Sequence, residues 1–393
     1  MHPTTTERIE LTLPTGNQSL DWQSAHGWNP PRHIQPVNAE VNADTAYQAI
    51  SQGKALLWQG DYHQGRQMLA ALKRRLNKKL RSFDALELPE RFHRIRLQRS
   101  QAARQLGLLL IEVRPGYVID LARAPDAKDA LRMAYGDRLQ NTHFLVPLSE
   151  LIGIFSAFEW SRKGLPVTSL DHNIYPKWGV FAPTRHEYLD LVMQAELPNP
   201  CATALDVGTG TGVLAMILAK RGINQITATD TSASACACAE DNVRRAGLGS
   251  TIKVLNADLI PEGKFDLVVC NPPWLPGAAS SPLEGAVYDP EHQMLKGFLQ
   301  KVGAHLNPNG QAWLILSDLA EHLQLRKREV LLDWINRAGL QCHKKLDARP
   351  THRKVSDTTD PLAEFRRLEV TSVWQLRLSS SVEMPLPPLR ASR

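Results

Sequence analysis

The sequence predicts an α/β protein: a Rossmann-like seven-stranded sheet with helices on both faces, preceded by a separate α-rich or α+β N-terminal domain. Three observations support this prediction. The length of 393 residues is too great for one average domain. Beyond about residue 175, short apolar strands alternate with helical stretches, as a parallel sheet demands. Two of these strands run into glycine-rich or proline-rich turns, which end a strand abruptly.

The composition is that of an ordinary globular protein. Hydrophobic residues make up 43% and charged residues 22% of the chain, which is enough apolar surface for a sizeable core. The formal net charge of +6 is compatible with an acidic partner without requiring one. The five cysteines are few and odd in number, which favours reduced thiols. Because no secretory signal and no apolar run of about 18 residues is found, we expect a cytoplasmic protein that does not enter a membrane.

The first part of the chain divides into an irregular lead-in, residues 1–40, and a domain over residues 41–165. The lead-in is rich in Pro, Asn, Thr and Gln, which predicts little regular structure. Within the domain, apolar residues at three- and four-residue spacing between Met68 and Leu80 predict a helix. Two strands, Leu108–Val113 and Tyr117–Ala122, are predicted to form a hairpin, followed by helices over 127–139 and 149–163.

The stretch from Lys73 to Arg104 is basic, because it contains eleven Lys or Arg residues and only three acidic residues. Two interpretations remain open: a solvated basic helix face, or a surface that contacts phosphates. The region carries no glycine-rich loop and no catalytic constellation. We therefore expect this domain to serve in recognition.

The second domain is predicted over residues 175–378, followed by a disordered tail, 379–393, that is rich in Ser and Pro. The predicted strands are 203–207, 226–230, 252–256, 266–270, 311–317, 341–347 and 369–377, and the predicted helices are 212–221, 232–246, 291–306 and 321–338.

The first predicted strand of this domain leads into the sequence ALDVGTGTG, residues 204–212. Gly208, Gly210 and Gly212, with Thr209 between the first two, let the backbone pass close to a ligand at the start of the next helix. A dinucleotide loop needs the spacing G-x-G-x-x-G and faces a pyrophosphate, for which Asp206 is an unfavourable neighbour. The pattern fits better a ligand that carries an amino group and no phosphate.

Two further acids end the next two strands. Asp230 lies where Rossmann-like folds place an acid on a ribose diol, and Asp258 lies where a carboxylate can accept from an adenine amino group. The alternative for each is a cap on the following helix.

The fourth strand ends in the sequence NPPW, residues 271–274. The side-chain oxygen of Asn271 and the carbonyl of Pro272 can accept the two protons of a planar NH2 group, and Trp274 can stack on the flat system that carries it. Such a set presents a weakly nucleophilic nitrogen to an electrophilic carbon. The alternative is that Asn-Pro-Pro is merely a turn.

In this order, the glycine turn, the two acids and NPPW resemble the class I S-adenosylmethionine-dependent methyltransferases that methylate planar nitrogens. The chain is similar to the small-domain ribosomal RNA guanine or adenine N-methyltransferases and to the release-factor glutamine methyltransferases. The resemblance covers about residues 175–378. It implies strand order 3-2-1-4-5-7-6 with the last strand antiparallel, and S-adenosylmethionine as cofactor.

The resemblance also implies roles for single residues. The three glycines cradle the methionine portion, Asp230 holds the ribose and Asp258 the adenine, while Asn271, Pro272 and Trp274 hold the acceptor. Thr184 and Arg185 are placed over the methionine end of the cofactor, the alternative being a helix cap and a surface charge.

The identity of the methyl acceptor stays open among RNA, protein and small molecules. The basic stretch favours an exocyclic base amine of RNA, in particular ribosomal RNA, and protein glutamine is the alternative. The N-terminal domain is larger than that of the glutamine methyltransferases and lacks the strand–helix alternation of a duplicated methyltransferase domain. A non-catalytic S-adenosylmethionine-binding protein is a further alternative.

Other functions are disfavoured. An NAD-dependent oxidoreductase requires a different glycine spacing. Cys236 and Cys238 lie on a predicted helix, where their spacing points them to different faces, so no metal site is expected. Residues 275–289 are expected to form a lid beside the site, and residues 349–367 a loop that reaches the substrate or lies on the surface.

Overall fold

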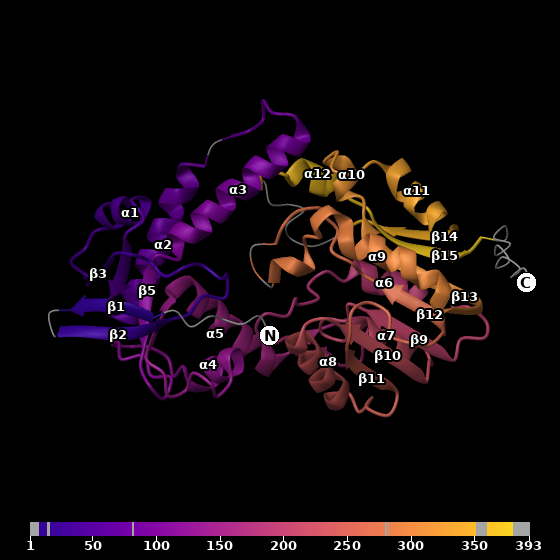
Figure 1. Ribbon diagram of the computed structural model, residues 1–393, viewed down its shortest axis with the longest axis horizontal. Coiled ribbons are helices and arrows are strands. Elements are labelled where there is room, and N and C mark those ends of the chain that lie inside the picture. The colour runs from indigo at the N-terminus through magenta and orange to yellow at the C-terminus, as the bar shows by residue number, and fades with distance from the viewer. Residues whose placement is uncertain are drawn as a thin grey trace, which may run out of the picture.

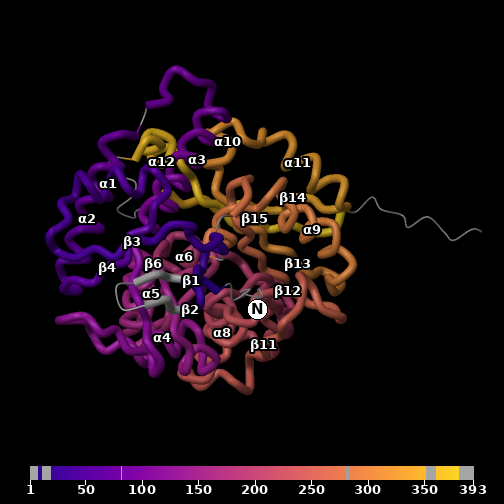
Figure 2. The backbone as a smooth tube through the Cα atoms, turned by 60° about the vertical axis from the view of Figure 1, so that its left-hand side comes forward, coloured from indigo at the N-terminus to yellow at the C-terminus, as the bar shows by residue number. Residues whose placement is uncertain are grey.

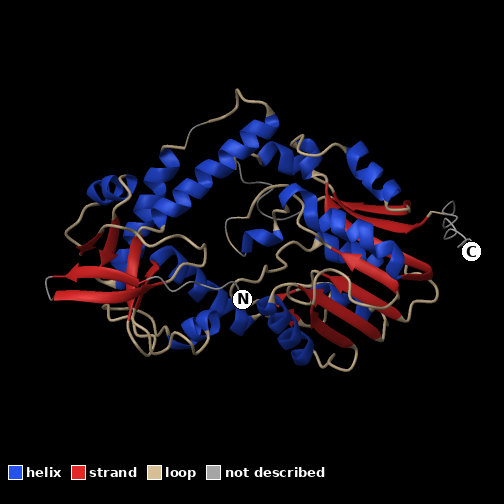
Figure 3. Ribbon diagram, viewed as in Figure 1, coloured by secondary structure: helices blue, strands red, loops and turns tan. Residues whose placement is uncertain are grey.

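The computed structural model describes residues 8–13, 16–80, 82–279, 281, 283–350 and 360–379. Two lobes, each built on its own sheet, lie side by side (Figure 1). Figure 3 shows the two groups of strands separated by helices. Except for residue 379, the tail that we expected to be disordered lies outside the described residues.

The N-terminal lobe is a six-stranded mixed sheet in the order β1-β2-β6-β5-β4-β3. Its strands are β1 (Arg8–Leu13), β2 (Gly16–Trp22), β3 (Ile34–Val37), β4 (Ala55–Trp58), β5 (Leu109–Val113) and β6 (Phe144–Pro147). Its helices are α1 (Ala43–Ser51), α2 (Tyr62–Lys78), α3 (Leu88–Leu106), α4 (Lys128–Tyr135) and α5 (Leu148–Lys163). The helices α1, α2 and α5 pack with β4, β5 and β6 around one core that includes the fully buried Trp58.

Three expectations for this lobe are wrong. The region before residue 40 is not an irregular lead-in, because β1, β2 and β3 are strands of the sheet. Residues 117–122 form only an isolated bridge at Val118, since β4 and β6 already occupy both edges of β5. Strand–helix alternation is present: β3, β4 and β5 are parallel and are connected through α1 and through α2 with α3.

The C-terminal lobe contains a seven-stranded sheet in the order β11-β10-β9-β12-β13-β15-β14, with β15 antiparallel to both neighbours. This confirms the expected order 3-2-1-4-5-7-6. The strands are β9 (Thr203–Val207), β10 (Gln225–Asp230), β11 (Ile252–Asn256), β12 (Phe265–Cys270), β13 (Leu306–Ser317), β14 (Leu340–Ala348) and β15 (Thr371–Leu378). Two short strands, β7 (Leu165–Pro166) and β8 (Asn173–Ile174), pair in the connection between the lobes.

The helices of this lobe are α6 (Glu187–Gln194), α7 (Val213–Lys220), α8 (Ala233–Arg245), α9 (Gln293–Val302), α10 (Leu319–His322), α11 (Arg328–Arg337) and α12 (Ala363–Leu368). The helix expected over 321–338 is two helices, because Gln324 adopts a left-handed φ of 57° that ends the first. The helix expected from residue 291 begins at Gln293, because Glu291 and His292 have φ of 51° and 58°.

The lobes are joined by α3, which reaches from the N-terminal sheet to α10 and α12 (Figure 1). Its Phe92 and Ile95 are buried among Leu275, Leu319 and Leu362 of the C-terminal lobe, together with Leu323 and Ala320. Beside this apolar contact, the Arg91 guanidinium binds Glu364 at 3.1 Å and that of Arg99 binds Asp360 at 3.0 Å. Part of the basic stretch on α3 is therefore an interdomain contact, which neither interpretation of the sequence foresaw.

Within the described residues, no helix is both long and apolar enough to traverse a lipid bilayer. The described part of the chain also holds no group of three or more His, Cys, Asp or Glu placed to share a metal ion.

Candidate active site

The register of the sheet brings the glycine turn and NPPW together. Val207, the last residue of β9, pairs with Cys270, the last residue of β12, and with Thr229 of β10. Gly208 and Asn271 therefore leave the same edge of the sheet from adjacent strands. This edge is where open α/β sheets form their ligand crevice.

The glycine turn is left-handed at three positions, with φ of 72° at Gly208, 55° at Gly210 and 83° at Gly212. Only glycine adopts these angles without strain. A Cβ on Gly210 would meet nothing within 4 Å, so this face of the turn is open to a ligand, whereas a Cβ on Gly212 would lie 3.3 Å from Ala239. Gly212 thus serves the close packing of α7 on α8 and does not line the cleft.

Asp206 is fully buried beneath the turn. Its Oδ2 accepts hydrogen bonds from the Thr209 hydroxyl at 2.6 Å and from the Ala215 backbone N–H at 3.1 Å, while Oδ1 has no partner among the described residues. Burial raises the pKa of this carboxyl to about 6, against the effect of its two hydrogen bonds. Asp206 therefore fixes the turn, and its second oxygen is a buried acceptor without a partner among the described residues.

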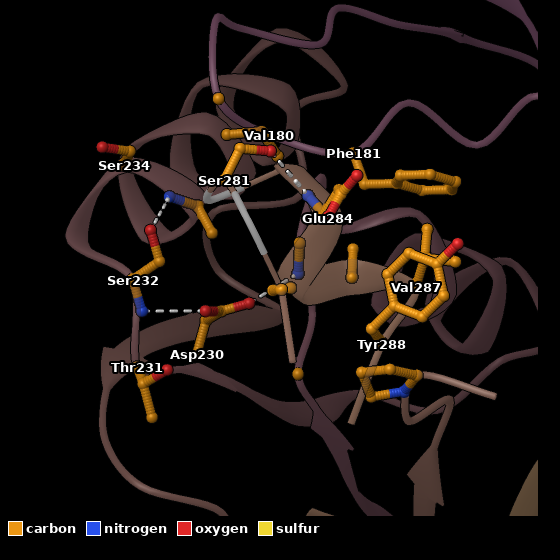
Figure 4. Close-up of a pocket in the computed structure, with 18 of the residues that line it drawn as sticks. Val180, Phe181, Asp230, Thr231, Ser232, Ser234, Ser281, Glu284, Val287 and Tyr288 are labelled. Carbon is orange, nitrogen blue, oxygen red and sulfur yellow. Dashed lines mark hydrogen bonds between the residues drawn. The ribbon is translucent and has the colours of Figure 1, made fainter. Parts of the chain in front are cut away.

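Asp230 and Asp258 both line the cleft. The carboxylate of Asp230 accepts from the backbone N–H groups of Gly210 at 3.0 Å and Ser232 at 2.8 Å, so it ties the glycine turn to the start of α8 (Figure 4). The Asp258 side chain is largely exposed and lies 3.7 Å from the Lys301 ammonium. Both carboxylates border the cleft, and their contact with a cofactor stays a prediction.

The NPPW segment is oriented by a hydrogen bond of its own. The indole N–H of Trp274 donates to Oδ1 of Asn271 at 2.9 Å. Asn271 and Trp274 are half-buried on the cleft wall, and Pro272 is buried beside them. Because the indole holds the carboxamide in place, Asn271 is ready to accept a further proton from a ligand.

Arg185 supports Trp274 from behind. Its guanidinium lies 4.5 Å from the centre of the Trp274 ring. Its nitrogens donate to Glu187 at 2.5 Å, to the fully buried Glu369 at 2.8 Å and to Thr371 at 2.9 Å. The side chain is thus not a surface charge, because buried partners and the Trp274 ring hold its guanidinium. Thr184 and Arg185 both border the cleft, and their contact with a cofactor stays a prediction.

The cleft has a volume of about 2870 Å³ and is lined by both lobes. Figure 4 shows Asp230 and Ser232 on one side, and Phe181, Val287 and Tyr288 on the other. The N-terminal lobe adds His26 and Trp28, whose rings stack with centroids 4.3 Å apart, together with Tyr135. The sequence did not identify these residues as part of the site, although two tryptophans and a histidine within seven residues are an unusual concentration.

The segment expected to form a lid, called the lid segment below, is described at residues 275–279, 281 and 283–289 and lines the cleft. Its ends are tied by backbone hydrogen bonds from Leu275 N–H to Val287 and from Asp289 N–H to Leu275. Helix α3 of the other lobe holds its middle. The Arg96 guanidinium donates to the Ala278 carbonyl at 2.6 Å, lies 3.6 Å from the centre of the Tyr288 ring, and approaches Glu284 at 3.7 Å.

Part of the loop expected over 349–367, residues 351–359, lies outside the described residues. At its end, Asp360 accepts from Arg99 and Arg366, and Arg366 borders the cleft. The loop thus takes part in the contact between the lobes.

Residues 171–336 match the family model of the methyltransferase small domain. Most of the C-terminal lobe is thus similar to a methyltransferase small domain. The match includes the glycine turn, NPPW and the lid segment, and it ends within α11.

Individual relatives include RNA and protein methyltransferases. The chain is 34% identical over 124 residues to the tRNA1(Val) (adenine(37)-N6)-methyltransferase of Pedobacter heparinus, which covers 30% of this chain and 53% of the relative. It is 34% identical over 170 residues to the release factor glutamine methyltransferase of Deinococcus radiodurans, which covers 41% of this chain and 55% of the relative. The chain thus spans about half the length of the curated relatives that it matches.

Proposed function

We propose that this protein is an S-adenosylmethionine-dependent N-methyltransferase whose acceptor is an exocyclic base amine of RNA. The observation that carries the proposal is the pairing of Val207 with Cys270, which sets the glycine turn and Asn271 side by side on one cleft. A methyl donor bound at the glycine turn and a planar amine bound at Asn271 are therefore neighbours. Proximity of this kind supplies a large part of the rate enhancement of a bimolecular reaction.

The residues present fit the proposed cofactor. The unpartnered Oδ1 of Asp206 provides an acceptor below the turn, the open face of Gly210 leaves room for a ligand, and the Asp230 carboxylate can accept from a ribose diol. S-adenosylmethionine, when bound, supplies a methyl group on an electrophilic sulfonium. None of the chain's own residues then needs to activate the donor.

The chain acts on the acceptor. On this proposal, Asn271 Oδ1 and the Pro272 carbonyl accept the two amine protons, and the nitrogen lone pair then points toward the glycine turn. The same two oxygens stabilise the positive charge that develops on the nitrogen, at about 3 kcal/mol for a well-placed group. The surplus proton passes to solvent after transfer.

Two observations support RNA as the acceptor. A relative that shares the NPPW-bearing domain methylates adenine in tRNA according to its name, and the interdomain cleft is roomy and rich in aromatic side chains. Protein glutamine is the second candidate, because the release factor methyltransferases match to the same degree. For an RNA acceptor we place the protein in the cytoplasm, in keeping with its five free cysteines.

The decisive experiment incubates the purified protein with methyl-labelled S-adenosylmethionine and cell lysate, with and without ribonuclease. We expect label in the RNA fraction and its loss after ribonuclease. Label that stays in protein after ribonuclease would favour protein glutamine as the methyl acceptor. Binding of the cofactor with no transfer to any fraction would rule out both.

A further inference from the structure

A second cavity, of about 770 Å³, lies in the N-terminal lobe between α1, α2, the C-terminal part of α3 and the segment 28–33. Figure 2 shows α1, α2 and β3 side by side in this lobe. Its lining includes three cations, two aromatic residues shared with the methyltransferase cleft, a tyrosine and a row of glutamines, and it includes no Asp or Glu. A surface of this composition suits an anion with flat rings.

The cations of this cavity are Arg32, Lys79 and Arg104, and all three are exposed. They come from three different segments of the chain, and no described carboxylate lies within ion-pair distance of any of them. In this they differ from Arg91, Arg96 and Arg99, which the C-terminal lobe neutralises. Cations gathered without counter-charges are the electrostatic signature of a phosphate-binding surface.

Aromatic and amide side chains line the same cavity as the cations. The Lys79 ammonium lies 4.5 Å from the centre of the Tyr47 ring, so a cation and an aromatic face are presented together. Gln98, Gln101 and Gln105 lie three and four residues apart on α3, which places them on one helix face. Single-stranded nucleic acids are bound by this combination of cations along a backbone and aromatic rings under bases, and amides can bond base edges.

The cavity lies next to the methyltransferase cleft and shares three lining residues with it. Trp22, Trp28 and Asn29 line both. The Trp28 ring is wedged against Gly107, where an added Cβ would lie 2.2 Å from it, and its other neighbour is the His26 ring in the cleft. A strand lying in the cavity would thus pass these rings on its way to Asn271.

We propose that this cavity, the RNA groove, binds the single-stranded segment of RNA that flanks the methylated base. Arg32, Lys79 and Arg104 bind its phosphates, and Tyr47 offers a face to a base. The proposal rests on the proposed function and adds to it a binding site outside the catalytic lobe.

The test measures binding of a fluorescently labelled single-stranded RNA oligonucleotide to the full chain over a range of salt concentrations. The variant is the triple substitution Arg32→Gln, Lys79→Gln and Arg104→Gln. The control is Lys253→Gln, Lys264→Gln and Lys327→Gln, which removes the same charge from exposed lysines of the C-terminal lobe.

We expect the groove variant to raise Kd at least about tenfold in low salt and to lower the slope of log K against log salt by about 2, because each lost contact to a single strand removes about 0.7. Methyl transfer at saturating RNA should keep its kcat, with a higher KM. The control should match the wild type.

Two results would overturn the proposal. If the wild type binds and methylates RNA while the groove variant binds it as tightly as the control, the groove is not the site, and the proposed function stands. If the wild type binds no RNA, and polyglutamate binds in its place with the same loss in the groove variant, the groove holds an acidic protein segment.

Discussion

Asn271 is oriented before any substrate arrives, because the Trp274 indole already donates to its side-chain oxygen. Trp274 is in turn held by the guanidinium of Arg185, whose charge is compensated by Glu187 and Glu369. On the side proposed to bind the acceptor, buried carboxylates thus hold Arg185, Arg185 holds Trp274, and Trp274 orients the carboxamide of Asn271. Each step can be broken separately.

Replacing Asn271 with alanine removes the oxygen that binds the amine and leaves the glycine turn untouched. We expect turnover to fall about 100- to 1,000-fold, the usual effect of losing one such acceptor or donor in a transition state. Cofactor affinity, measured by calorimetric titration, should stay near that of the wild type. Wild-type turnover with saturating substrate would remove Asn271 from the mechanism.

The substitution Trp274→Phe keeps an aromatic face and deletes the N–H that orients Asn271. We expect kcat to fall about tenfold, close to the worth of one hydrogen bond, and less than in the Asn271 variant. A double variant with Asn271→Ala should show no further loss, because the orienting bond then has nothing to orient. Additive losses in this cycle would mean that the two residues act independently.

Sequence reasoning finds residues whose spacing along the chain carries the chemistry, and NPPW and the glycine turn are of this kind. It could not find the partner of Arg185, because Glu369 lies 184 residues further on. It could not find His26 or Trp28 either, since the fold alone brings them to a cleft formed by distant strands.

At the scale of elements, α3 is the main surprise. Its sequence indicates a basic amphipathic helix, and its arginines turn out to bind the other lobe and the lid segment. By contrast, the strands of the C-terminal lobe follow their predicted ranges closely except for the earlier start of β13 at Leu306, because each is a short apolar run between clear turn signals. The N-terminal strands were missed because they lie in a polar, proline-containing segment.

Arg96→Ala should release the lid segment while the lobes stay joined through Phe92 and Ile95. We expect KM for the acceptor to rise about tenfold, with faster proteolysis within residues 275–289 as the readout of lid order. Arg94→Ala is the matched control, because Arg94 lies on the same helix and pairs only with its neighbour Glu90 among the described residues. Equal protease sensitivity in the two variants would contradict the role of Arg96.

At the scale of the whole molecule, the sequence anticipates two domains but not their interface, whose contacts join residues about 270 positions apart. The pH dependence of the free energy of unfolding is also a property of the whole molecule. In the N-terminal lobe, burial raises the pKa of Glu150 to about 7, although the Ala25 N–H and the Tyr135 hydroxyl both donate to it at 2.8 Å. Both donors belong to the wall of the cleft.

The raised pKa predicts a specific pH dependence. The folded protein keeps the Glu150 proton up to about pH 7, whereas the unfolded chain releases it near its ordinary pKa of 4.5. The folded state therefore binds more protons between these values, and the free energy of unfolding falls as the pH rises through them, by about 3 kcal/mol from this group. Below this window the contribution is fully present.

Glu150→Gln should remove this part of the slope, as measured by urea unfolding at pH 5 and pH 8, and should make the protein more stable than the wild type at pH 8. Some slope remains, because Asp206 has its pKa raised to about 6 in the same direction. Glu159→Gln, on the same helix but exposed and paired with Lys163, should leave the wild-type slope unchanged. An unaltered slope in the Glu150 variant would refute the assignment.

The contacts between α3 and the lid segment have a consequence for the rate of turnover. On our proposal, the spent cofactor lies beneath the lid segment, which is held by α3 of the other lobe. It is therefore released only when the two lobes move apart. Motions of such large bodies are slowed by solvent friction. We therefore expect multiple turnover to slow in sucrose in proportion to viscosity, while a single methyl transfer in preformed complexes keeps its rate.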